Sequence, residues 1–275
     1  MSVTFAVIGR NEAATLRTSL THTLETATPL DRVVYVDGGS TDRSTEIARS
    51  MGVEVARAEP GKGRAIAAAA AVAGPDALCT IDADIAWSET NIPGRLRDAY
   101  ARTGADMIVA SFVQQERVRT IIPGLYRPLV RELFPEGLHV GGPTPITGFR
   151  LVGPGRMPRE LPAGWGVETF LNLRLALDGF RIETIEVGRY EGPLKGYANI
   201  ERMAEDIMET ILELAVSEGR LDAAVRPAWE EWGEAVVDHA RALPVPAAER
   251  WAFEDRLMEL GARPLPAPRA VSAPR

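Results

Sequence analysis

Two carboxylates follow an apolar run in the stretch ALCTIDADIAW, residues 77–87: Asp82 and Asp84, separated only by Ala83. On an extended segment, side chains two positions apart point to the same side. Like charges held together are unfavourable unless a cation lies between them, and hard divalent cations take carboxylate oxygens together with phosphate oxygens. The pair therefore predicts a metal and diphosphate site, and the alternative is a strand-end turn in which Asp bonds local backbone.

A second polar segment, VVYVDGGSTD at residues 33–42, ends a β-branched run in the same way. Its last three residues are explained as a helix cap. A cap does not require the acid at Asp37 or the glycines that follow from Gly38, which allow a ligand to approach the backbone closely. Asp37 accepts hydrogen bonds, so it suits an N–H of a base or a hydroxyl of a sugar.

Two weaker segments carry further candidate groups. PGKGRA, residues 60–65, places Lys62 between glycines at the start of a predicted helix, where an anion can bind. It lacks the G-x-x-x-x-G-K-[ST] pattern of a P-loop, and a simple turn is the alternative. IGRNEA, residues 8–13, places Arg10 and Glu12 after the first apolar run, where a solvated loop and helix cap is the alternative.

The elements that would position these groups alternate along the first half of the chain. Predicted strands cover residues 4–8, 32–36, 53–56, 77–81, 107–112 and 181–187, and predicted helices cover residues 16–24, 44–50, 64–73, 92–102 and 167–177. Such alternation predicts an α/β fold with a mostly parallel, Rossmann-like sheet flanked by helices. Ligands of these sheets bind beyond the carboxyl ends of the strands, so the segments that begin at Gly9, Asp37 and Asp82 would gather along one edge.

The rest of the chain divides into a loop-rich segment, helices and a tail. Residues 137–166 are rich in Gly and Pro and are expected to form ordered loops and short strands around a site. Apolar residues recur at helical spacing from Asn199 to Glu218, and a further helix is expected over residues 229–242. We therefore predict a catalytic domain over residues 1–198, helices over 199–260 that pack on a second copy in a homodimer, and a Pro-rich disordered tail over 261–275.

The composition excludes several classes of partner. The chain has 38 acidic and 31 basic residues and a net charge of −7, so neither nucleic acid nor an anionic membrane surface is expected to bind it. A local group of arginines instead indicates one specific small anion: Arg117, Arg119, Arg127 and Arg131. The single cysteine, Cys79, excludes an intrachain disulfide. The sequence shows no signal peptide and no apolar run of about 20 residues, so a cytoplasmic protein without a membrane span is expected.

Together and in this order, the four segments resemble the nucleotide-sugar-dependent glycosyltransferases of the GT-A fold. The counterparts are the first-strand N-E turn, the D-G-S-T-D turn, the G-K-G loop and the D-x-D metal motif. The resemblance implies a set of residues that border the base and ribose: Ile8, Arg10, Glu12, Asp37 and Gly38. It also implies that Lys62 lies near the base or phosphates and that Asp82, with Ala83 beside it, meets the ribose or sugar. Asp84 would bind Mg²⁺ or Mn²⁺ on the diphosphate.

The second half resembles a narrower group, the glucosyl-3-phosphoglycerate synthases and their mannosyl relatives, through RVRTIIPGLYRPLVRELFPE, GGPTPITGFR and GWGVETFLN. These are soluble retaining enzymes that move a hexose from a nucleotide donor onto a phosphorylated glycerate. The resemblance implies that Arg119 and Thr120 contact the acceptor phosphate, as an Arg and a hydroxyl are able to do; a solvated helix face is the alternative. It also implies that the turn of Gly141, Gly142 and Thr144 lines the donor sugar and the acceptor.

One departure from this group concerns the metal. The relatives complete the metal site with a His just before a P-L pair, whereas VGRYEGPLKGY at residues 187–197 contains none. Glu191 is the candidate oxygen ligand in its place, with Asp82 as a further one. Alternatively, Arg189 or Lys195 holds the diphosphate instead.

These features predict a metal-dependent hexosyltransferase. Its donor is a nucleoside-diphosphate sugar, with UDP favoured over GDP, and its acceptor is a small molecule that bears a phosphate or carboxylate. The resemblance implies that transfer occurs with retention. Catalytic roles fall to Asp84, through the metal, and to Glu168, which would face the sugar or the acceptor hydroxyls; a Glu in the first turn of a helix is also a favourable dipole partner. Three alternatives stay open: a polyprenyl-phosphate glycosyltransferase, a nucleotidyltransferase and a non-catalytic nucleotide-sugar binder.

Overall fold

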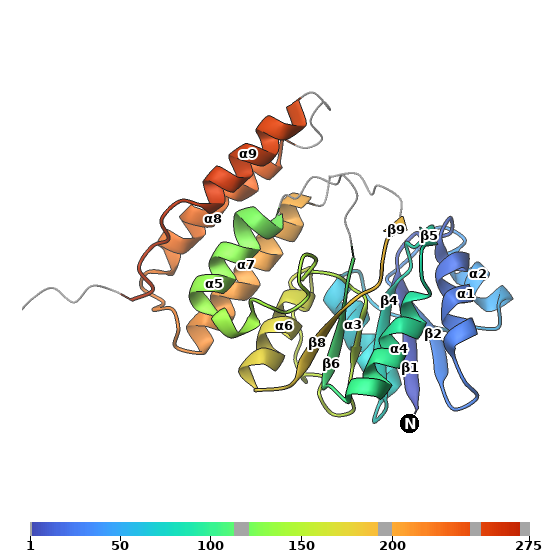
Figure 1. The fold of residues 1–275 in the computed structure, drawn as a ribbon. Coiled ribbons are helices and arrows are strands. Elements are labelled where there is room, and N and C mark those ends of the chain that lie inside the picture. Colours follow the sequence, from blue (N-terminus) through green and yellow to red (C-terminus); the bar gives the residue numbers. More distant parts are fainter. Residues whose placement is uncertain (1, 113–120, 192–199, 243–248, 270–275) are drawn as a thin grey trace, which may run out of the picture.

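The computed structural model describes residues 2–112, 121–191, 200–242 and 249–269, and Figure 1 shows their arrangement. A seven-stranded sheet has the order β3-β2-β1-β4-β7-β6-β8. Its strands are β1 (Val3–Gly9), β2 (Arg32–Asp37), β3 (Glu54–Arg57), β4 (Ala77–Asp82), β6 (Met107–Ser111), β7 (Arg150–Val152) and β8 (Ile182–Glu186). All neighbours pair in parallel except β7, which is antiparallel to both β4 and β6. The predicted α/β class and mostly parallel sheet are confirmed.

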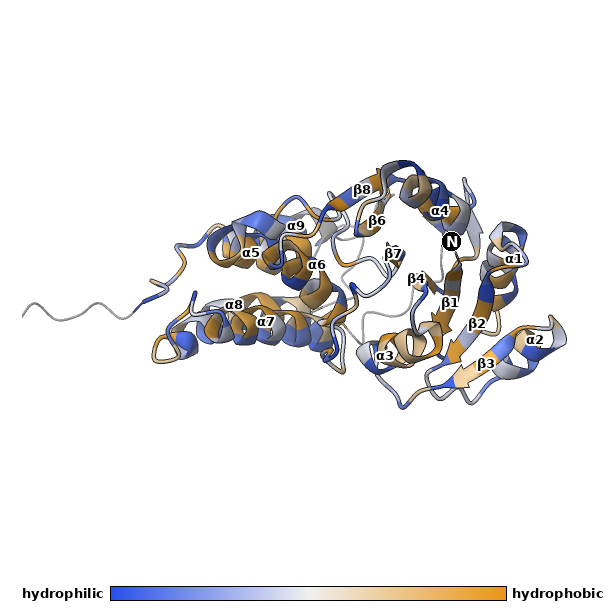
Figure 2. Cartoon of the chain, turned by 90° about the horizontal axis from the view of Figure 1, so that it is seen from below, coloured by the Kyte–Doolittle hydropathy of each residue, from blue (hydrophilic) through white to orange (hydrophobic). Residues whose placement is uncertain are grey.

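Helices cover both faces of the sheet (Figure 2). One face packs against α1 (Leu16–Thr26), α2 (Ser44–Ser50) and α4 (Ile92–Thr103), and the other against α3 (Lys62–Ala73) and α6 (Val167–Leu177). Alternate residues of β1 point to opposite faces of the sheet. Phe5 and Val7 lie in the core with α1, α2 and α4, and Ala6 and Ile8 lie in the core with α3 and α6. A strand that is apolar on both sides is typical of a parallel sheet buried between helices.

A third core lies beside the sheet and is built mainly from helices (Figure 1). It contains the π-helical turn η1 (Ile122–Tyr126), α5 (Arg127–Leu133), α7 (Ile200–Ser217), α8 (Arg226–Ala240) and α9 (Arg250–Gly261), and the short 3₁₀ turn η2 (Pro135–Gly137) lies next to α5. Leu173 of α6 also belongs to this core. The helices predicted over residues 199–260 therefore pack on residues 121–134, which the sequence placed in the catalytic domain.

The tail requires a correction. Residues 261–275 were predicted to be disordered, but part of this segment is bound to the helical core. Asp222 N–H donates to Pro268 O at 2.9 Å, and Trp229 Nε1 donates to Ala267 O at 3.3 Å. The prediction is therefore wrong for residues 261–269, because a Pro-rich chain still has carbonyl oxygens that accept hydrogen bonds from the helical core.

A small ribbon was not predicted. Strands β5 (Trp87–Ser88) and β9 (Tyr190–Glu191) pair in an antiparallel fashion, with Trp87 opposite Glu191. Two-residue strands carry too little periodicity to be recognised in a sequence. The ribbon matters because it brings the segment after β8 next to the segment after β4.

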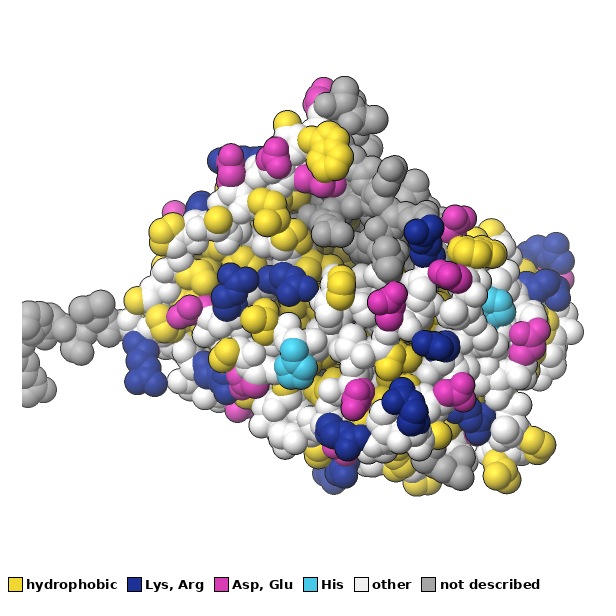
Figure 3. All heavy atoms as spheres, viewed as in Figure 1, with side chains coloured by type: hydrophobic (Ala, Val, Ile, Leu, Met, Phe, Trp, Pro, Cys, Tyr) yellow, Lys and Arg dark blue, Asp and Glu magenta, His cyan; other side chains and the backbone are white. Residues whose placement is uncertain are grey.

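The surface carries both signs of charge. On the face drawn in Figure 3, Lys and Arg side chains are interspersed with Asp and Glu side chains, and no continuous basic area is visible. Within the described part of the chain, no helix is both long and apolar enough to cross a membrane.

Asp31 ties the sheet to a helix. Its carboxylate accepts the N–H of Val3 at 2.9 Å and that of Thr28 at 2.7 Å, and it pairs with Arg97 Nη1 at 2.6 Å. Burial by itself raises the pKa of Asp31, but the hydrogen bonds from these three groups outweigh it and lower the pKa from 3.8 to about 2.

We expect Asp31→Asn to lower the free energy of unfolding by about 2 kcal/mol at pH 7, because each pKa unit corresponds to about 1.4 kcal/mol. A depressed pKa in the folded state stabilises the protein fully above the unfolded-state pKa of about 4, and this stabilisation is lost as the pH falls towards 2. Urea denaturation of both proteins at pH 7 and pH 3 measures the effect. The difference should shrink by about half at pH 3; a difference that does not depend on pH would contradict the assignment.

Candidate active site

The carboxyl ends of the central strands meet at one edge of the sheet. In the register of β1 with its neighbours, Gly9 lies opposite Asp37 and Ile8 lies opposite Asp82. The polar segments that follow these strands therefore begin side by side. This edge is the position at which open α/β sheets bind ligands.

The loops after β1 and β2 are bonded to each other. Gly38 N–H donates to Gly9 O at 3.0 Å, Asn11 N–H donates to Ser40 Oγ at 2.9 Å, and Thr41 N–H donates to Asn11 Oδ1 at 2.8 Å. Asn11 has a φ of 59°, a left-handed conformation that Asn tolerates better than most residues. Hydrogen bonds thus join the two loops into one wall at the edge of the sheet.

The residues predicted to border the base and ribose lie in this wall at different depths. Ile8 is buried at 8% exposure, Glu12 and Asp37 are each 4% exposed, and Arg10 is exposed. Asp37 Oδ1 accepts Ser40 N–H at 2.9 Å. Asp37 therefore bonds the backbone of its own turn, and Arg10 is the group of this set that reaches furthest into solvent.

The Asp-Ala-Asp turn after β4 is fixed by its middle residue. Ala83 is 1% exposed; its N–H donates to Ile8 O at 2.9 Å, and its carbonyl accepts from Thr15 Oγ1 at 2.9 Å. The two carboxylates project from this anchored backbone. A Cβ on Gly148 would lie 2.2 Å from Asp82 Oδ1, so the glycine makes room for the carboxylate.

Lys62 joins two acids that lie far apart in the sequence. Its Nζ is 3.2 Å from Asp82 Oδ1 and 2.6 Å from Glu168 Oε1, and the side chain of Glu168 is only 2% exposed. Lys62 is the first residue of α3, Asp82 ends β4 and Glu168 lies in the first turn of α6. The structure thus brings together three residues that the sequence proposed separately for donor binding. We call Lys62, Asp82 and Glu168 the acid–base cluster.

The charges of the cluster reinforce one another. Burial by itself lowers the pKa of Lys62, but the negative charges of Asp82 and Glu168, with Asp84 farther away, outweigh it and raise the pKa above its ordinary value. Lys62 is therefore a permanent cation at the sheet edge. Trp165 lies against it, with the ring centroid 5.6 Å from Nζ.

Arg150 lies beneath the cluster and was missed by the sequence analysis. It is fully buried; its guanidinium donates to Thr147 O, to Asn172 Oδ1 at 3.0 Å and to Glu168 O at 3.4 Å. Burial lowers the pKa of Arg150, and the charges of Glu168 and Asp82 counteract that effect. An arginine inside the apolar run GFRLV was the available signal, since buried arginines occur almost only where they are paired or hydrogen-bonded.

The turn of Gly141, Gly142 and Thr144 lies at the end of β6. Gly142 O accepts from Arg127 Nη2 at 2.7 Å, and Gly141 N–H donates to Thr184 Oγ1 at 2.9 Å. Thr144 is 2% exposed, and its hydroxyl lies 3.3 Å from the N–H of Phe112, which donates to it. Its side chain therefore holds the turn on the sheet, and the backbone and Arg127 form the accessible part.

The predicted third metal ligand does not join the two aspartates. Glu191 lies on β9, where its carbonyl accepts Ala86 N–H at 2.8 Å. Among the described residues, however, no three or more His, Cys, Asp and Glu side chains are grouped so as to hold a metal ion. The backbone of Glu191 thus lies beside the segment that follows Asp84. The predicted acceptor residues Arg119 and Thr120 lie outside the described residues, as does Lys195.

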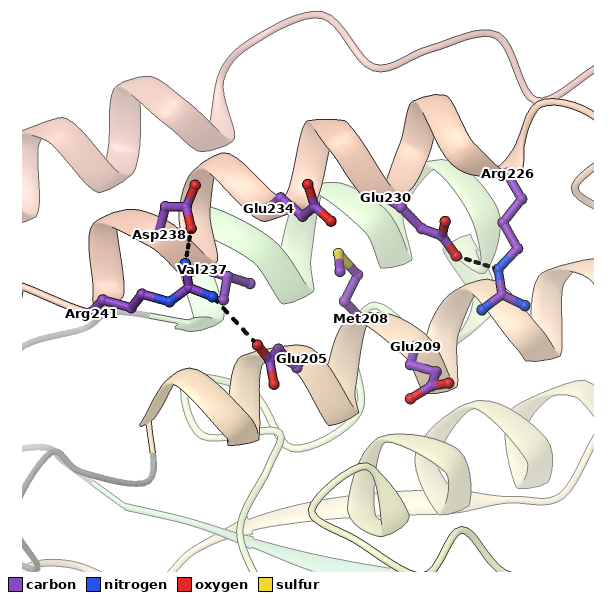
Figure 4. Close-up of a pocket in the computed structure, with 9 residues that line it drawn as sticks. All are labelled: Glu205, Met208, Glu209, Arg226, Glu230, Glu234, Val237, Asp238 and Arg241. Carbon is purple, nitrogen blue, oxygen red and sulfur yellow. Dashed lines mark hydrogen bonds and ion pairs between the residues drawn. The ribbon is translucent and has the colours of Figure 1, made fainter.

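A cavity of about 510 Å³ opens between α7 and α8 (Figure 4). It is lined by Glu205, Met208, Glu209, Arg226, Glu230, Glu234, Val237, Asp238 and Arg241. None of these residues was predicted for the site. Its two arginines pair with acids that line it, Arg226 with Glu230 and Arg241 with Asp238 and Glu205. None of the lining residues belongs to the acid–base cluster.

Comparison with known proteins identifies the family. The family model described as glycosyl transferase family 2 matches residues 4–150, more than half of the chain and the part that carries β1, β2, β4 and the Asp-Ala-Asp turn. The chain belongs to this family. It is a glycosyltransferase. No curated protein sequence matches this glycosyltransferase significantly.

Solved structures confirm the fold of this glycosyltransferase. It is similar to glucosyl-3-phosphoglycerate synthase from Mycobacterium tuberculosis in complex with Mn²⁺, UDP-glucose and phosphoglyceric acid, with a TM-score of 0.68, 21% identity and 81% of each chain covered. It is similar to the same synthase with Mn²⁺, UDP-glucose and glycerol 3-phosphate, with a TM-score of 0.66, 22% identity and coverage of 81% and 82%. At this identity the likeness establishes the GT-A fold, and the predicted resemblance is confirmed at that level.

Proposed function

We propose that this glycosyltransferase transfers a hexosyl group from a uridine diphosphate sugar to a hydroxyl of a small acceptor that bears a phosphate or carboxylate, with retention of configuration. The observation that carries the proposal is the acid–base cluster beside Asp84 at the carboxyl edge of the sheet. Carboxylates accept hydrogen bonds from sugar hydroxyls, and an ammonium group binds phosphate oxygens.

The nucleotide is assigned to the wall formed by the loops after β1 and β2. Arg10 and Asp37 supply a donor and an acceptor there, and Gly38 leaves the backbone open to a ligand. Uridine is favoured over guanosine because the similar synthase structures contain UDP or UDP-glucose. GDP-sugars are the alternative donor.

A divalent cation fits at Asp82 and Asp84 only if it also binds the diphosphate of the donor. Asp82 is engaged by Lys62, and the described residues do not supply a third carboxylate or imidazole. Mg²⁺ and Mn²⁺ accept few protein oxygens when phosphates and water complete their shell, so Asp84, with Asp82 nearby, would hold a cation that also binds the diphosphate. The synthase structures contain Mn²⁺ or Mg²⁺ together with UDP. When bound, such a cation neutralises charge that develops on the leaving diphosphate.

The protein residues would act by binding and orientation. Lys62 adds a fixed positive charge where the leaving group becomes more negative, an interaction that is stronger in the transition state than in the ground state. Glu168, held by Lys62 at 2.6 Å, would orient hydroxyls of the sugar or of the acceptor. We propose retention through attack from the side of the leaving group, because the resemblance to retaining synthases implies it; Glu168, which is engaged in an ion pair with Lys62, is assigned to binding.

The acceptor is assigned to the side of the Gly141–Thr144 turn. Arg127 lies at this turn through its bond to Gly142 O, and a guanidinium suits phosphate or carboxylate groups. The similar synthase structures contain phosphoglyceric acid or glycerol 3-phosphate. Arg119 and Thr120 remain part of the proposed acceptor site.

Two further proposals concern the oligomeric state and the cellular location of the protein. A homodimer is supported by α9, where Trp251 is 74% exposed and Met258 is 54% exposed, seven positions apart and so on one helix face. Light scattering that gives the mass of a single chain would contradict it. A cytoplasmic location stays a prediction from the sequence.

A donor screen by calorimetry tests the function. UDP, UDP-glucose, GDP and GDP-mannose are titrated into the protein with and without Mn²⁺, and turnover with 3-phosphoglycerate is followed by NMR, which also reports the anomeric configuration. We expect one nucleotide sugar to bind only with metal and an α-linked product to form from an α-linked donor. Binding without turnover on any acceptor would favour a non-catalytic binder, and pyrophosphate release from UTP and a sugar phosphate would favour a nucleotidyltransferase.

A further inference from the structure

The segment of residues 162–166, which leads into α6, is held from two sides. On one side the N-terminus of α3 binds it, since Gly63 N–H donates to Gly164 O at 3.1 Å and Arg64 N–H donates to Ala163 O at 3.2 Å. The first N–H groups of a helix have no partner within the helix. The segment therefore caps α3 directly after the lysine that begins it.

On the other side, Asp206 of α7 binds the same segment. Its Oδ2 accepts the N–H of Trp165 at 2.8 Å. A Cβ on Gly164 would lie 2.1 Å from that oxygen, and a Cβ on Gly166 would lie 1.9 Å from Thr210 Oγ1. The two glycines are thus what allows α7 to approach so closely. The segment connects the helical core, to which α7 belongs, with the edge of the sheet.

Both ends of the segment lead to the acid–base cluster. Lys62 begins the helix that the segment caps, and Glu168 follows Gly166 by two positions. Asp206 binds the backbone N–H of Trp165, and the ring of the same residue faces the Lys62 ammonium in an attractive cation–π arrangement. The distance between Lys62 and Glu168 therefore depends on where the segment lies.

We infer that Asp206 is a positioning residue for the donor sugar, because it holds residues 162–166 where Lys62 and Glu168 meet. The inference rests on the proposed function and extends it to a residue of the C-terminal helices. Asp206 acts through the backbone of Trp165 and not on the substrate. A displacement of a binding group by about 1 Å is sufficient to cost a substantial factor in rate or affinity.

The test compares three variants on one helix. Asp206→Ala removes the acceptor of the Trp165 N–H, whereas Asp206→Asn keeps an amide oxygen at the same place. Glu209→Ala is the matched control, since Glu209 lies three positions along α7 and lines the cavity of Figure 4 instead. We expect Asp206→Ala to raise the KM for UDP-glucose about tenfold with an unchanged acceptor KM, Asp206→Asn to return it to within about twofold, and Glu209→Ala to change neither.

A second variant, Gly164→Ala, perturbs the contact between Asp206 and residues 162–166 from the side of that segment. Gly164→Ala places a Cβ against Asp206 Oδ2, so it should raise the KM for UDP-glucose when Asp206 is present. In the Asp206→Ala background the carboxylate is gone, and Gly164→Ala should add no further increase. Such non-additivity is the signature of two residues that act through one contact.

Several results would overturn the inference. A wild-type KM for UDP-glucose in Asp206→Ala would do so, and so would additive effects of the two substitutions. A parallel change of the donor and acceptor constants together with a lower unfolding midpoint would show that Asp206 is merely structural. If the wild-type protein binds no UDP-glucose with Mn²⁺, the proposed function itself fails, whereas normal binding by Asp206→Ala removes only this inference.

Discussion

Asp84→Asn is expected to lower kcat on the order of 10²- to 10³-fold, the effect typical of removing one group that stabilises developing transition-state charge. Asn has the size of Asp but no negative charge, so it holds a divalent cation poorly beside the diphosphate. Initial rates with UDP-glucose and saturating Mn²⁺ measure the change. Calorimetry should show that UDP binding by the variant no longer depends on Mn²⁺.

The control for this substitution is Asp98→Asn. Asp98 is an exposed aspartate of α4, and its replacement should leave kcat and the unfolding midpoint within experimental error. If Asp84→Asn retains the wild-type kcat and the wild-type metal dependence, the Asp-Ala-Asp turn is structural, and the metal assignment fails.

Lys62→Met is expected to reduce stability and donor binding together. Met fills a similar volume but leaves Glu168, which is 2% exposed, without its cation. Breaking a buried ion pair by removing one partner costs about 3–5 kcal/mol, and the remaining exposure of Lys62 and Asp82, 15% and 24%, places the expected loss at the low end, about 3 kcal/mol. Urea denaturation measures it, and calorimetry with UDP-glucose and Mn²⁺ should show binding weakened at least about tenfold.

A double variant separates the two effects. In Lys62→Met with Glu168→Gln, no buried charge is left unpaired at Glu168, so more than half of the lost stability should return. Donor binding should not return, because the phosphate-binding cation is still absent. Recovery of both would mean that Lys62 contributes to binding only by keeping the site folded.

The alternation of apolar strands and amphipathic helices was sufficient to predict the sheet. The strand predicted over residues 77–81 is β4 (Ala77–Asp82), and the helix predicted over residues 199–218 is α7 (Ile200–Ser217). These elements are long and periodic, so their pattern survives without knowledge of the partners they pack on. The three residues of the acid–base cluster could also be proposed from the sequence, because each follows a strand or opens a helix.

The contacts that hold the acid–base cluster together could not be predicted from the sequence. Lys62 and Glu168 are 2.6 Å apart in space but more than a hundred positions apart in sequence, and no local pattern encodes their pairing. The sequence did not distinguish Asp206 from the other acidic residues on the polar face of α7. Short strands were expected within residues 137–166, but the position of β7 and its antiparallel pairing were not, since three residues are too few for a periodic pattern. Pairing across long sequence distances is decided by tertiary packing rather than by local propensity.

The antiparallel β7 also imposes an order on folding. Strand β1 pairs with β2 and β4, and β2 pairs with β3, whereas the other edge of β4 pairs with β7, and β6 pairs with β7 and β8. Until Arg150–Val152 have been synthesised, one edge of β4 and both edges of β6 are open, and unpaired strand edges are templates for aggregation. A nascent chain that ends near residue 112 therefore exposes the edge of β4 and the edges of β6 that β7 and β8 later cover.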